Sequence, residues 1–288
     1  MEARKKRKIL SVIDKIICYF FLVVIGIILI FPFYYMVARS FMTIDQLNER
    51  PLEMIPVKLT FASYIRTFSQ ANYFGYTFNT LKIVLFNVIA VPLASSFVAY
   101  GFARCRFYGR KIFFGIMLGT MMLPAIVMQI PTYTIFAKIG WLNTYLPLTI
   151  PNILGGGAMN VFLIRQFMSS LPKDLDEAAV VDGASKIRIY FTIILPLCTP
   201  ILIFIVVGVF VANWGDYFGP LIYMNVVDES KYTLAYKIFR SSTTEYIGSM
   251  GESIKMAAGT FMSLFPALLF FLFQRQLVDG IVMSGIKG

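Results

Sequence analysis

The stretch that decides the fold runs from residue 177 to residue 184 and reads Glu-Ala-Ala-Val-Val-Asp-Gly-Ala. It lies in a polar interruption, residues 169–195, of a chain that is hydrophobic on both sides. Pro172 suits the first turn of a helix, because its missing N–H costs nothing there. Acidic residues that favour the positive end of the helix dipole follow at once, and they are Asp174, Asp176 and Glu177.

A turn and a second helix are predicted directly after this first helix. Gly183 can end the first helix at positive φ and reverse the chain. A basic helical piece, residues 185–194, then runs into Pro196. Ala178 and Ala179 carry no bulk, so another surface can approach the first helix closely. The pattern predicts a helix-turn-helix on a membrane face, built to be gripped by another protein.

The composition places the rest of the chain in a membrane. Hydrophobic residues make up 58% of the 288 residues, charged residues make up 14%, and the mean hydropathy is +0.74. Such a chain cannot cover itself with polar surface, so the bilayer is its solvent. The net charge of +11 would suggest nucleic acid in a soluble protein, but here its distribution over the loops matters more. The chain has no histidine, so we expect no catalytic residue, no metal site and no cofactor.

Six hydrophobic runs are long enough to cross about 30 Å of hydrocarbon. They predict an all-α polytopic membrane protein, with residues 1–288 forming a single transmembrane domain. The first run exceeds the apolar region of a signal peptide and lacks a small-residue cleavage site, so we interpret it as an uncleaved helix. The six predicted spans are residues 16–38, 80–103, 112–136, 145–165, 197–223 and 256–274.

The positive-inside rule orients these spans. Most of the 26 lysines and arginines lie in the segments assigned to the inside, although the outer loops are longer in total. Both termini, the loop 169–195 and a tail 275–288 are therefore predicted to be cytoplasmic. Prolines and glycines interrupt the fourth span, and the turn near Lys138 leaves the boundary between the third and fourth spans open.

Three stretches carry a resemblance to a known family. The Glu-Ala-Ala, Asp-Gly-Ala and Leu-Pro spacing resembles the signature loop of the membrane subunits of ABC importers. The segment from Trp214 to Leu221 is similar to one in carbohydrate-type permeases, although Gly215 replaces the usual asparagine. The ending Gly-Ile-Lys-Gly resembles that of the second permease of maltose-type systems. The resemblance implies an ABC type I importer permease in a bacterial cytoplasmic membrane.

The resemblance also implies three groups of site residues. Coupling to the ATPase would involve Glu177, Ala178, Ala179, Asp182, Gly183, Ala184 and Pro196. A second contact of the tail with the ATPases would involve Gly285, Lys287 and Gly288. Candidates for the pathway or its outer gate are Trp214, Asp216 and Tyr217. Asp216 is a functional candidate because an acidic residue near a membrane span is a functional hypothesis by default. Its alternative interpretation is a solvated residue at the outer interface.

The implied partners are separate chains. They are a second homologous permease, two ATP-binding cassette ATPases and an extracytoplasmic sugar-binding protein, which the outer loop 225–255 would reach. The sequence contains no Gly-x-x-x-x-Gly-Lys-Ser/Thr phosphate loop, so ATP hydrolysis is expected on the ATPase chains. In maltose-type systems the resemblance would place the sugar mainly in the other permease.

Two alternatives stay open. The first is an ABC importer of a solute other than a sugar, because the sequence does not identify the solute. The second is an ion-coupled secondary transporter, which would need carboxylates within the membrane or a repeated helix architecture. Only Asp216 offers itself as such a carboxylate, and the sequence shows no internal repeat.

Overall fold

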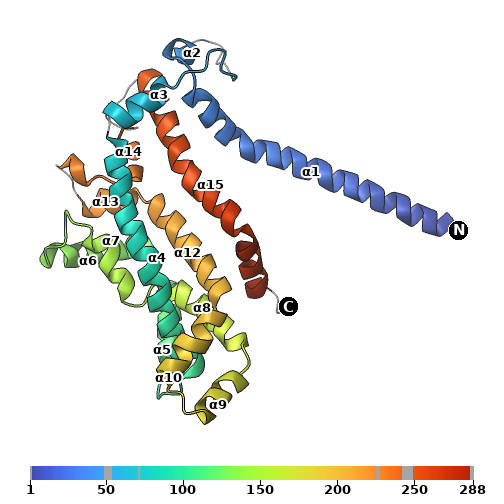
Figure 1. Ribbon diagram of the computed structural model, residues 1–288, viewed down its shortest axis with the longest axis vertical. Helices are drawn as coiled ribbons and strands as arrows, with labels where there is room; N and C mark the ends of the chain where they lie inside the picture. Colours follow the sequence, from blue (N-terminus) through green and yellow to red (C-terminus); the bar gives the residue numbers. More distant parts are fainter. Residues whose placement is uncertain (1, 49–53, 71, 225–227, 242–248, 286–288) are drawn as a thin grey trace. The chain divides into compact units, whose positions relative to one another are not determined.

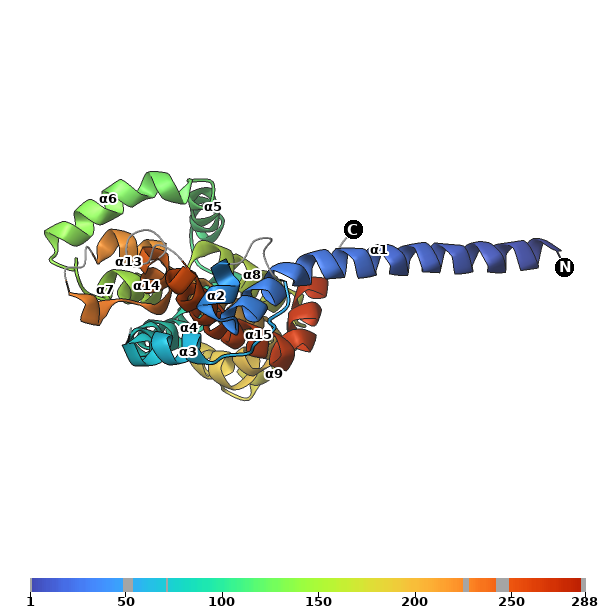
Figure 2. The ribbon, with the colours of Figure 1, turned by 90° about the horizontal axis from the view of Figure 1, so that it is seen from above.

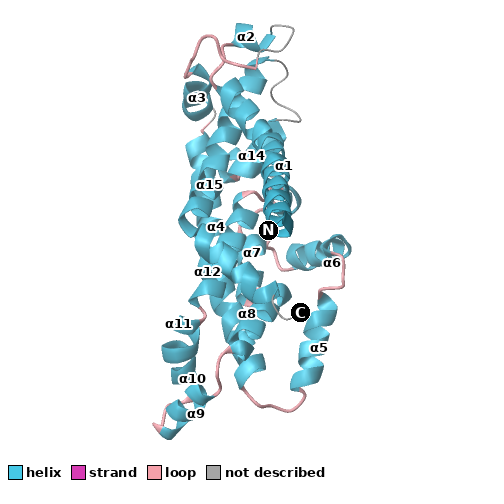
Figure 3. Cartoon of the chain, turned by 90° about the vertical axis from the view of Figure 1, so that its right-hand side faces the viewer, coloured by secondary structure: helices cyan, strands magenta, loops and turns pink. Residues whose placement is uncertain are grey.

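The computed structural model describes residues 2–48, 54–70, 72–224, 228–241 and 249–285. Every regular element within these ranges is a helix, as the hydropathy pattern predicts (Figure 3). The chain divides into two compact units. The first unit is Met1–Asn72 with Arg240–Ser263, and the second is Tyr73–Phe239 with Leu264–Gly288.

The first unit is built around the end of its longest helix. Its elements are α1 (Glu2–Ser40), α2 (Ile44–Asn48), α3 (Ala62–Ile65), the π-helix η1 (Arg66–Gln70) and the beginning of α15 (Ser249–Gly285). Arg39, near the end of α1, is 1% exposed and pairs with Glu252 of α15 at 2.6 Å. Phe68 packs edge-on against Phe261, with ring centroids 4.9 Å apart. These contacts join α1 and η1 to the first turns of α15.

Three helices pack side by side in the second unit: α4 (Tyr73–Arg104), α8 (Ala158–Ser170) and α12 (Thr199–Trp214), as Figure 1 shows. Each is rich in apolar residues, and their facing sides bury the largest core of the unit. Members of this core include Val91, Ala99, Val161, Ile164, Met168, Ile201 and Ile205. Asn87 of α4 is fully buried and donates to Leu148 O at 2.9 Å, so it serves contacts between elements.

Four helical stretches are long and apolar enough to cross a membrane as single spans. They are Val12–Ser40, Tyr73–Arg104, Leu146–Ser170 and Gly251–Leu277. The third predicted run is instead a pair of helices joined at a sharp bend: α5 (Arg110–Thr120) and α6 (Ala125–Lys138) meet at 98° (Figure 2). A second bend, of 76°, lies at the start of the fifth run, where Lys186–Leu197 of the loop meets Thr199–Trp214. The number of spans reaches six if each bent pair is one, so the predicted count stays a prediction.

The fourth predicted span is interrupted where its prolines and glycines lie. α7 (Leu146–Thr149) passes into the 3-10 helix η2 (Ile150–Ile153), and α8 begins only at Ala158. Between them Gly155, Gly156 and Gly157 all have positive φ. A Cβ on Gly156 would lie 2.4 Å from the carbonyl oxygen of Val91, so this backbone touches α4 directly. The interruption is therefore part of the packing of α4.

The observed ends of the helices differ from the predicted spans. α4 begins at Tyr73 rather than at residue 80, and α15 continues to Gly285. The sixth helix thus runs past its predicted end at residue 274. The cytoplasmic position of residues 275–288 stays a prediction. α12 ends at Trp214, and a short helix α13 (Phe218–Tyr223) follows it.

Part of the predicted outer loop 225–255 folds back on α4. Its regular elements are η4 (Glu229–Lys231) and α14 (Leu234–Arg240), followed by the first turns of α15. Asn79 donates to the carbonyl oxygen of Tyr232 at 3.0 Å, and Leu234 N donates to Thr80 Oγ1 at 2.8 Å. Polar side chains at the start of α4 therefore hold this loop.

Candidate functional site

The predicted helix-turn-helix lies between α8 and α12. Its first arm is α9 (Asp174–Val181), which has its three acidic residues in the first turn, as predicted. The N-cap is Lys173, whose carbonyl oxygen accepts from Asp176 N at 2.9 Å. Pro172 precedes the N-cap, so its predicted place in the first turn is wrong by a small shift. The proline ends the extended connection from α8 instead.

The turn after α9 is a Schellman motif. Gly183 has φ +76°, its N–H donates to Val180 O at 3.0 Å, and Ala184 N donates to Ala179 O at 2.9 Å. These two bonds satisfy carbonyl groups that the helix end would leave unpaired. The predicted glycine turn is confirmed.

The second arm starts at a side-chain cap and is not uniform. Ser185 Oγ accepts from Arg188 N at 3.3 Å and caps α10 (Lys186–Ile189). A π-helix, η3 (Tyr190–Ile194), and the short α11 (Leu195–Leu197) with Pro196 follow it. The arm is therefore helical, as predicted, but changes from α-helix to the wider π-helix before Pro196.

Three polar residues of α4 hold both arms. Ser96, Tyr100 and Arg104 are spaced four residues apart, so they share one face of the helix. Ser96 Oγ lies 2.7 Å from the hydroxyl of Tyr190, and the Tyr100 hydroxyl donates to Lys186 O at 3.0 Å. Both contacts fix the second arm. Sequence reasoning missed this set, although polar residues at this spacing in an apolar helix were its signal.

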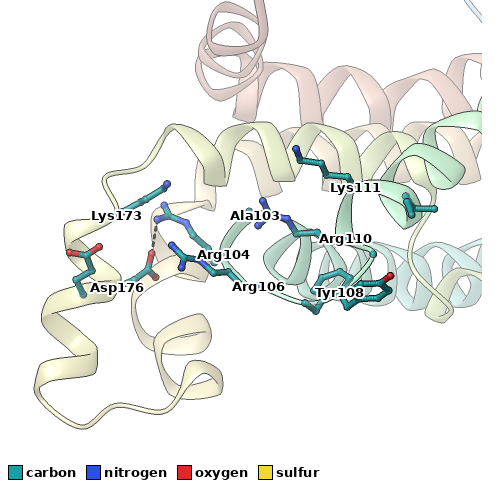
Figure 4. A pocket seen from close by; sticks show the side chains of 12 residues that line it. Ala103, Arg104, Arg106, Tyr108, Arg110, Lys111, Lys173 and Asp176 are labelled. Carbon is teal, nitrogen blue, oxygen red and sulfur yellow. Dashed lines mark hydrogen bonds and ion pairs between the residues drawn. The ribbon is translucent and has the colours of Figure 1, made fainter.

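Arg104 fixes the first arm. Its side chain, only 5% exposed, pairs with Asp176 Oδ2 at 2.6 Å (Figure 4). It also donates to the last carbonyl groups of α8 and the connection, at 2.7 Å to Met168 O and 2.9 Å to Leu171 O. The planar guanidinium group carries five N–H donors in a fixed fork, which suits simultaneous bonds to several acceptors better than the three donors of an ammonium group. α4, α8 and α9 are therefore joined at one residue.

The exposed face of the helix-turn-helix, which we call the loop surface, carries most of the predicted coupling residues. Glu177, Ala178, Asp182, Gly183 and Pro196 are exposed, and Ala184 is half-buried. Apolar side chains that the prediction did not include also lie open, namely Val180, Val181 and Ile187. Val181 is 87% exposed. Ala179 differs from the rest, because it is buried in the core cluster with Ile189 and Ile194.

A basic pocket of about 900 Å³ separates the first turn of α9 from the turn between α4 and α5. Figure 4 shows Lys173 and Asp176 on one wall and Arg110 and Lys111 on the other. Its cations are Arg104, Arg106, Arg110, Lys111 and Lys173, and its acids are Asp176 and Glu177. Within the described ranges, no group of three or more Cys, Asp or Glu side chains is arranged to hold a metal ion.

The predicted outer residues do not meet the loop surface. Trp214 is 1% exposed and stacks on Phe210, with ring centroids 5.5 Å apart. Asp216 Oδ1 accepts from Phe218 N at 3.0 Å and Gly219 N at 2.9 Å, so its carboxylate caps α13. Tyr217 is exposed and stacks on Phe239 at 4.6 Å. Trp214 therefore packs in the core and Asp216 is held at the start of α13. A role of Trp214, Asp216 and Tyr217 in the pathway or its outer gate stays a prediction.

The predicted tail contact lies largely outside the described residues. Gly285 is the last residue of α15, and Lys287 and Gly288 follow beyond the described ranges. Their proposed contact with the ATPases therefore stays a prediction.

Comparison with known proteins adds three findings. A family described as "Binding-protein-dependent transport system inner membrane component" matches residues 90–282. The trehalose/maltose transport permease of Thermococcus litoralis is 29% identical, covering 96% of this chain and 99% of its own. The galactooligosaccharide transport permease of Bacillus subtilis is 30% identical, covering 98% of each.

The fold has a close counterpart among solved structures. A chain of a bacterial ABC transporter that imports the acidic polysaccharide alginate superposes with a TM-score of 0.80. The two chains are 21% identical, and the match covers 96% of this chain and 97% of the other. The expected all-α fold is confirmed by this similarity.

Proposed function

Since this chain belongs to the family of inner-membrane components of binding-protein-dependent transport systems, we propose that it is one permease subunit of an ABC importer for oligosaccharides. It is a multi-pass membrane protein whose own role is not catalytic. The names of its relatives, which include permeases for trehalose, maltose and galactooligosaccharides, support the choice of solute.

The single observation that carries the proposal is an exposed loop surface on a helix, α9, that Arg104 holds against α4 and α8. Glu177 and Asp182 offer charge, and Val180 and Val181 offer exposed apolar area to a partner. Behind them Arg104 ties the same helix to α4 and α8. One side of α9 is thus exposed to a partner and the other is bonded to the membrane helices, so a movement of the partner can be transmitted to them.

The mechanism follows from that arrangement. Two ATPase chains close when they bind ATP, and α9 moves with the ATPase on which it docks. Because Arg104, Tyr100 and Ser96 join both arms to α4, the movement tilts α4 as a rigid element. The tilt exchanges inward and outward access, and ATP binding shifts the balance between the two states.

The remaining partners and the orientation belong to the same proposal. A second homologous permease completes the pathway, and an extracytoplasmic binding protein delivers the sugar to the outer loop 225–255. Both termini and the loop surface face the cytoplasm. Gly285, Lys287 and Gly288 add a second contact between the ATPases.

The test is uptake by the complete importer. The chain is expressed with the permease, ATPase and binding-protein genes beside its own, purified as a complex and placed in liposomes. We expect ATP inside the liposomes and the binding protein outside to drive uptake of at least one of trehalose, maltose and galactotriose. Uptake that runs without ATP and stops with an ionophore would establish the ion-coupled alternative instead. ATP-driven uptake of another solute, with none of the three sugars, would overturn the choice of sugar.

A further inference from the structure

An open cavity lined by both polar and apolar groups lies in the second unit, away from the loop surface. Its volume is about 360 Å³, at the lower end of the range of about 300–1,000 Å³ found for ligand sites. The interruption at Gly156 and Gly157 forms one wall and α12 forms another. The side chains that matter below are Asn152, Asn160, Asn213 and Ala212.

Asn152 and Asn213, which line the cavity, and Asn87 behind them form a connected hydrogen-bond network. Asn87 Nδ2 donates to Asn213 Oδ1 at 2.6 Å, and Asn152 Nδ2 donates to Asn87 Oδ1 at 3.0 Å. Asn213 Nδ2 donates to Val209 O at 2.8 Å. α4, η2 and α12 are thus joined by amide groups whose orientation the neighbouring acceptors determine.

Two amide oxygens at this cavity remain open. Asn152 uses its nitrogen on Asn87, and Asn160 uses its nitrogen on Gly156 O at 2.7 Å. Among the described residues, no donor reaches Asn152 Oδ1 or Asn160 Oδ1, and neither oxygen is sealed from solvent. The cavity therefore presents uncharged acceptors, which suit a ligand that brings hydroxyl donors.

The cavity lies within a candidate membrane span, where an open acceptor needs a polar partner. Asn152 and Asn160 belong to the candidate span Leu146–Ser170, where lipid would leave an open amide oxygen unsatisfied at a cost. Irregular backbone such as that at Gly155 to Gly157 is tolerated within a membrane where protein or a water-filled cavity covers it. The exposed residues at the cavity, Gly157, Gly208 and Ala212, are small, so they leave its mouth unobstructed.

We propose that this cavity is a contact site for the transported solute, in which Asn152 Oδ1 and Asn160 Oδ1 accept hydrogen bonds from hydroxyl groups of a neutral sugar. The proposal rests on the proposed function. It adds that this chain itself touches the sugar, in contrast to the expectation that the other permease holds it.

The first experiment measures protection of a cysteine in the complete importer. Ala212→Cys lies at the cavity, and Val211→Cys, the exposed neighbour on α12 that does not line it, is the matched control. Both are made in a chain whose three natural cysteines are serines. The transported sugar, at about ten times its dissociation constant, is expected to slow maleimide labelling of Ala212→Cys about tenfold, because only the empty fraction reacts. Labelling of Val211→Cys should not change.

The second experiment separates the acceptor role of Asn160 from its bond to Gly156. Asn160→Ala removes both, whereas Asn160→Asp keeps an acceptor oxygen. In the Ala212→Cys background we expect Asn160→Ala to weaken protection about three- to tenfold and Asn160→Asp to retain it. Equal losses in both variants would overturn the acceptor role.

The remaining outcomes are distinguishable. Sugar uptake by the wild-type importer without protection of Ala212→Cys would overturn this inference and leave the proposed function standing. Failure of Ala212→Cys to label in any state would show that the cavity is closed to solvent in the complete importer, and would also overturn it. Absence of uptake for trehalose, maltose and galactotriose alike would overturn the proposed function first.

Discussion

Two turns in the second unit both depend on a glycine at positive φ, but one glycine is packed against another helix and the other lies in open space. Gly156 has φ +67° and Gly183 has φ +76°, a region that favours glycine. At Gly156 a Cβ would meet the carbonyl oxygen of Val91 at 2.4 Å and Ser95 Cβ at 2.9 Å. At Gly183 it would meet nothing within 4 Å. The first turn thus serves the packing of the chain on itself, and the second leaves open space beside it, which is where the proposed ATPase would dock.

The largest expected effect is at the packed turn. Gly156→Ala combines backbone strain with a clash against main-chain atoms that cannot rotate away. We expect a loss of about 2–5 kcal/mol in the free energy of unfolding, a large share of the stability of a domain. Thermal unfolding in detergent, followed by size-exclusion chromatography, measures it.

Gly101→Ala is the control for that variant. Gly101 lies within α4, and a Cβ there would meet nothing within 4 Å. We expect its melting temperature to equal or slightly exceed that of the wild type, because alanine favours a helix over glycine. Equal melting temperatures for both variants would remove the contrast between the two turns.

The next effect is at the open turn, and it is on transport. Gly183→Leu strains the turn by about 1–2 kcal/mol, which leaves the protein folded in the membrane. Its side chain would project into the space for the partner, so we expect ATP-driven uptake to fall about tenfold or more. Uptake and ATP hydrolysis are measured together in liposomes.

Two controls separate strain from docking at this turn. Gly183→Asn keeps the turn, because asparagine tolerates positive φ, and should retain most of the uptake. Gly140→Leu imposes similar strain at φ +72°, away from the loop surface, and should also transport. Normal uptake by Gly183→Leu would refute close docking at this turn.

A smaller effect is expected at the mount behind the loop surface. Arg104→Met removes the ion pair with Asp176 and the bonds to Met168 O and Leu171 O. We expect uptake per ATP hydrolysed to fall about fivefold, with Arg104→Lys giving little rescue.

Arg106→Met is the matched control for Arg104→Met. Arg106 lines the same basic pocket but is exposed, and its charge lies in solvent. We expect its coupling to stay close to the wild-type value. If both variants lost coupling equally, the charge of the pocket rather than the clamp at Arg104 would be responsible.

The smallest effect is expected at the tail. Deletion of residues 285–288 removes Lys287, the only cation of this ending. We expect coupled ATPase activity to fall about twofold while the complex still assembles, because the deletion removes the proposed contact of Lys287 with the ATPases, and a single surface charge contact contributes little. Unchanged activity would return the tail to a loose end.

The glycine turn after α9 and the interruption of the fourth span could be predicted from the sequence, because both depend on neighbouring residues. Gly183 follows a helix with acidic residues at its start, so the turn and its hand could be predicted from local rules. The interruption of the fourth span was predicted from its prolines and glycines in the same way. The predicted all-α character is confirmed in the part of the chain that the structure describes.

The features that depend on distant residues could not be predicted. Nothing near Gly156 in the sequence indicates that Val91 lies against it. The clamp between Arg104 and Asp176 joins residues 72 positions apart. Ala179 and Val181 differ in burial although both belong to the same signature, because only the packing of α9 decides which side faces inward.

The long first helix has a consequence for how the protein is made. Val12–Ser40 has a mean hydropathy of 3.0 in its most apolar window, and none of that window is buried against the rest of the chain. A helix of this kind partitions into lipid by its own composition, since each leucine, isoleucine, phenylalanine or valine near its centre favours insertion by about 0.3–0.6 kcal/mol. Its insertion during synthesis therefore needs no later segment of the protein. The helices of the second unit must wait for one another to satisfy their asparagines and arginines, so biogenesis has an autonomous first step and a cooperative second one.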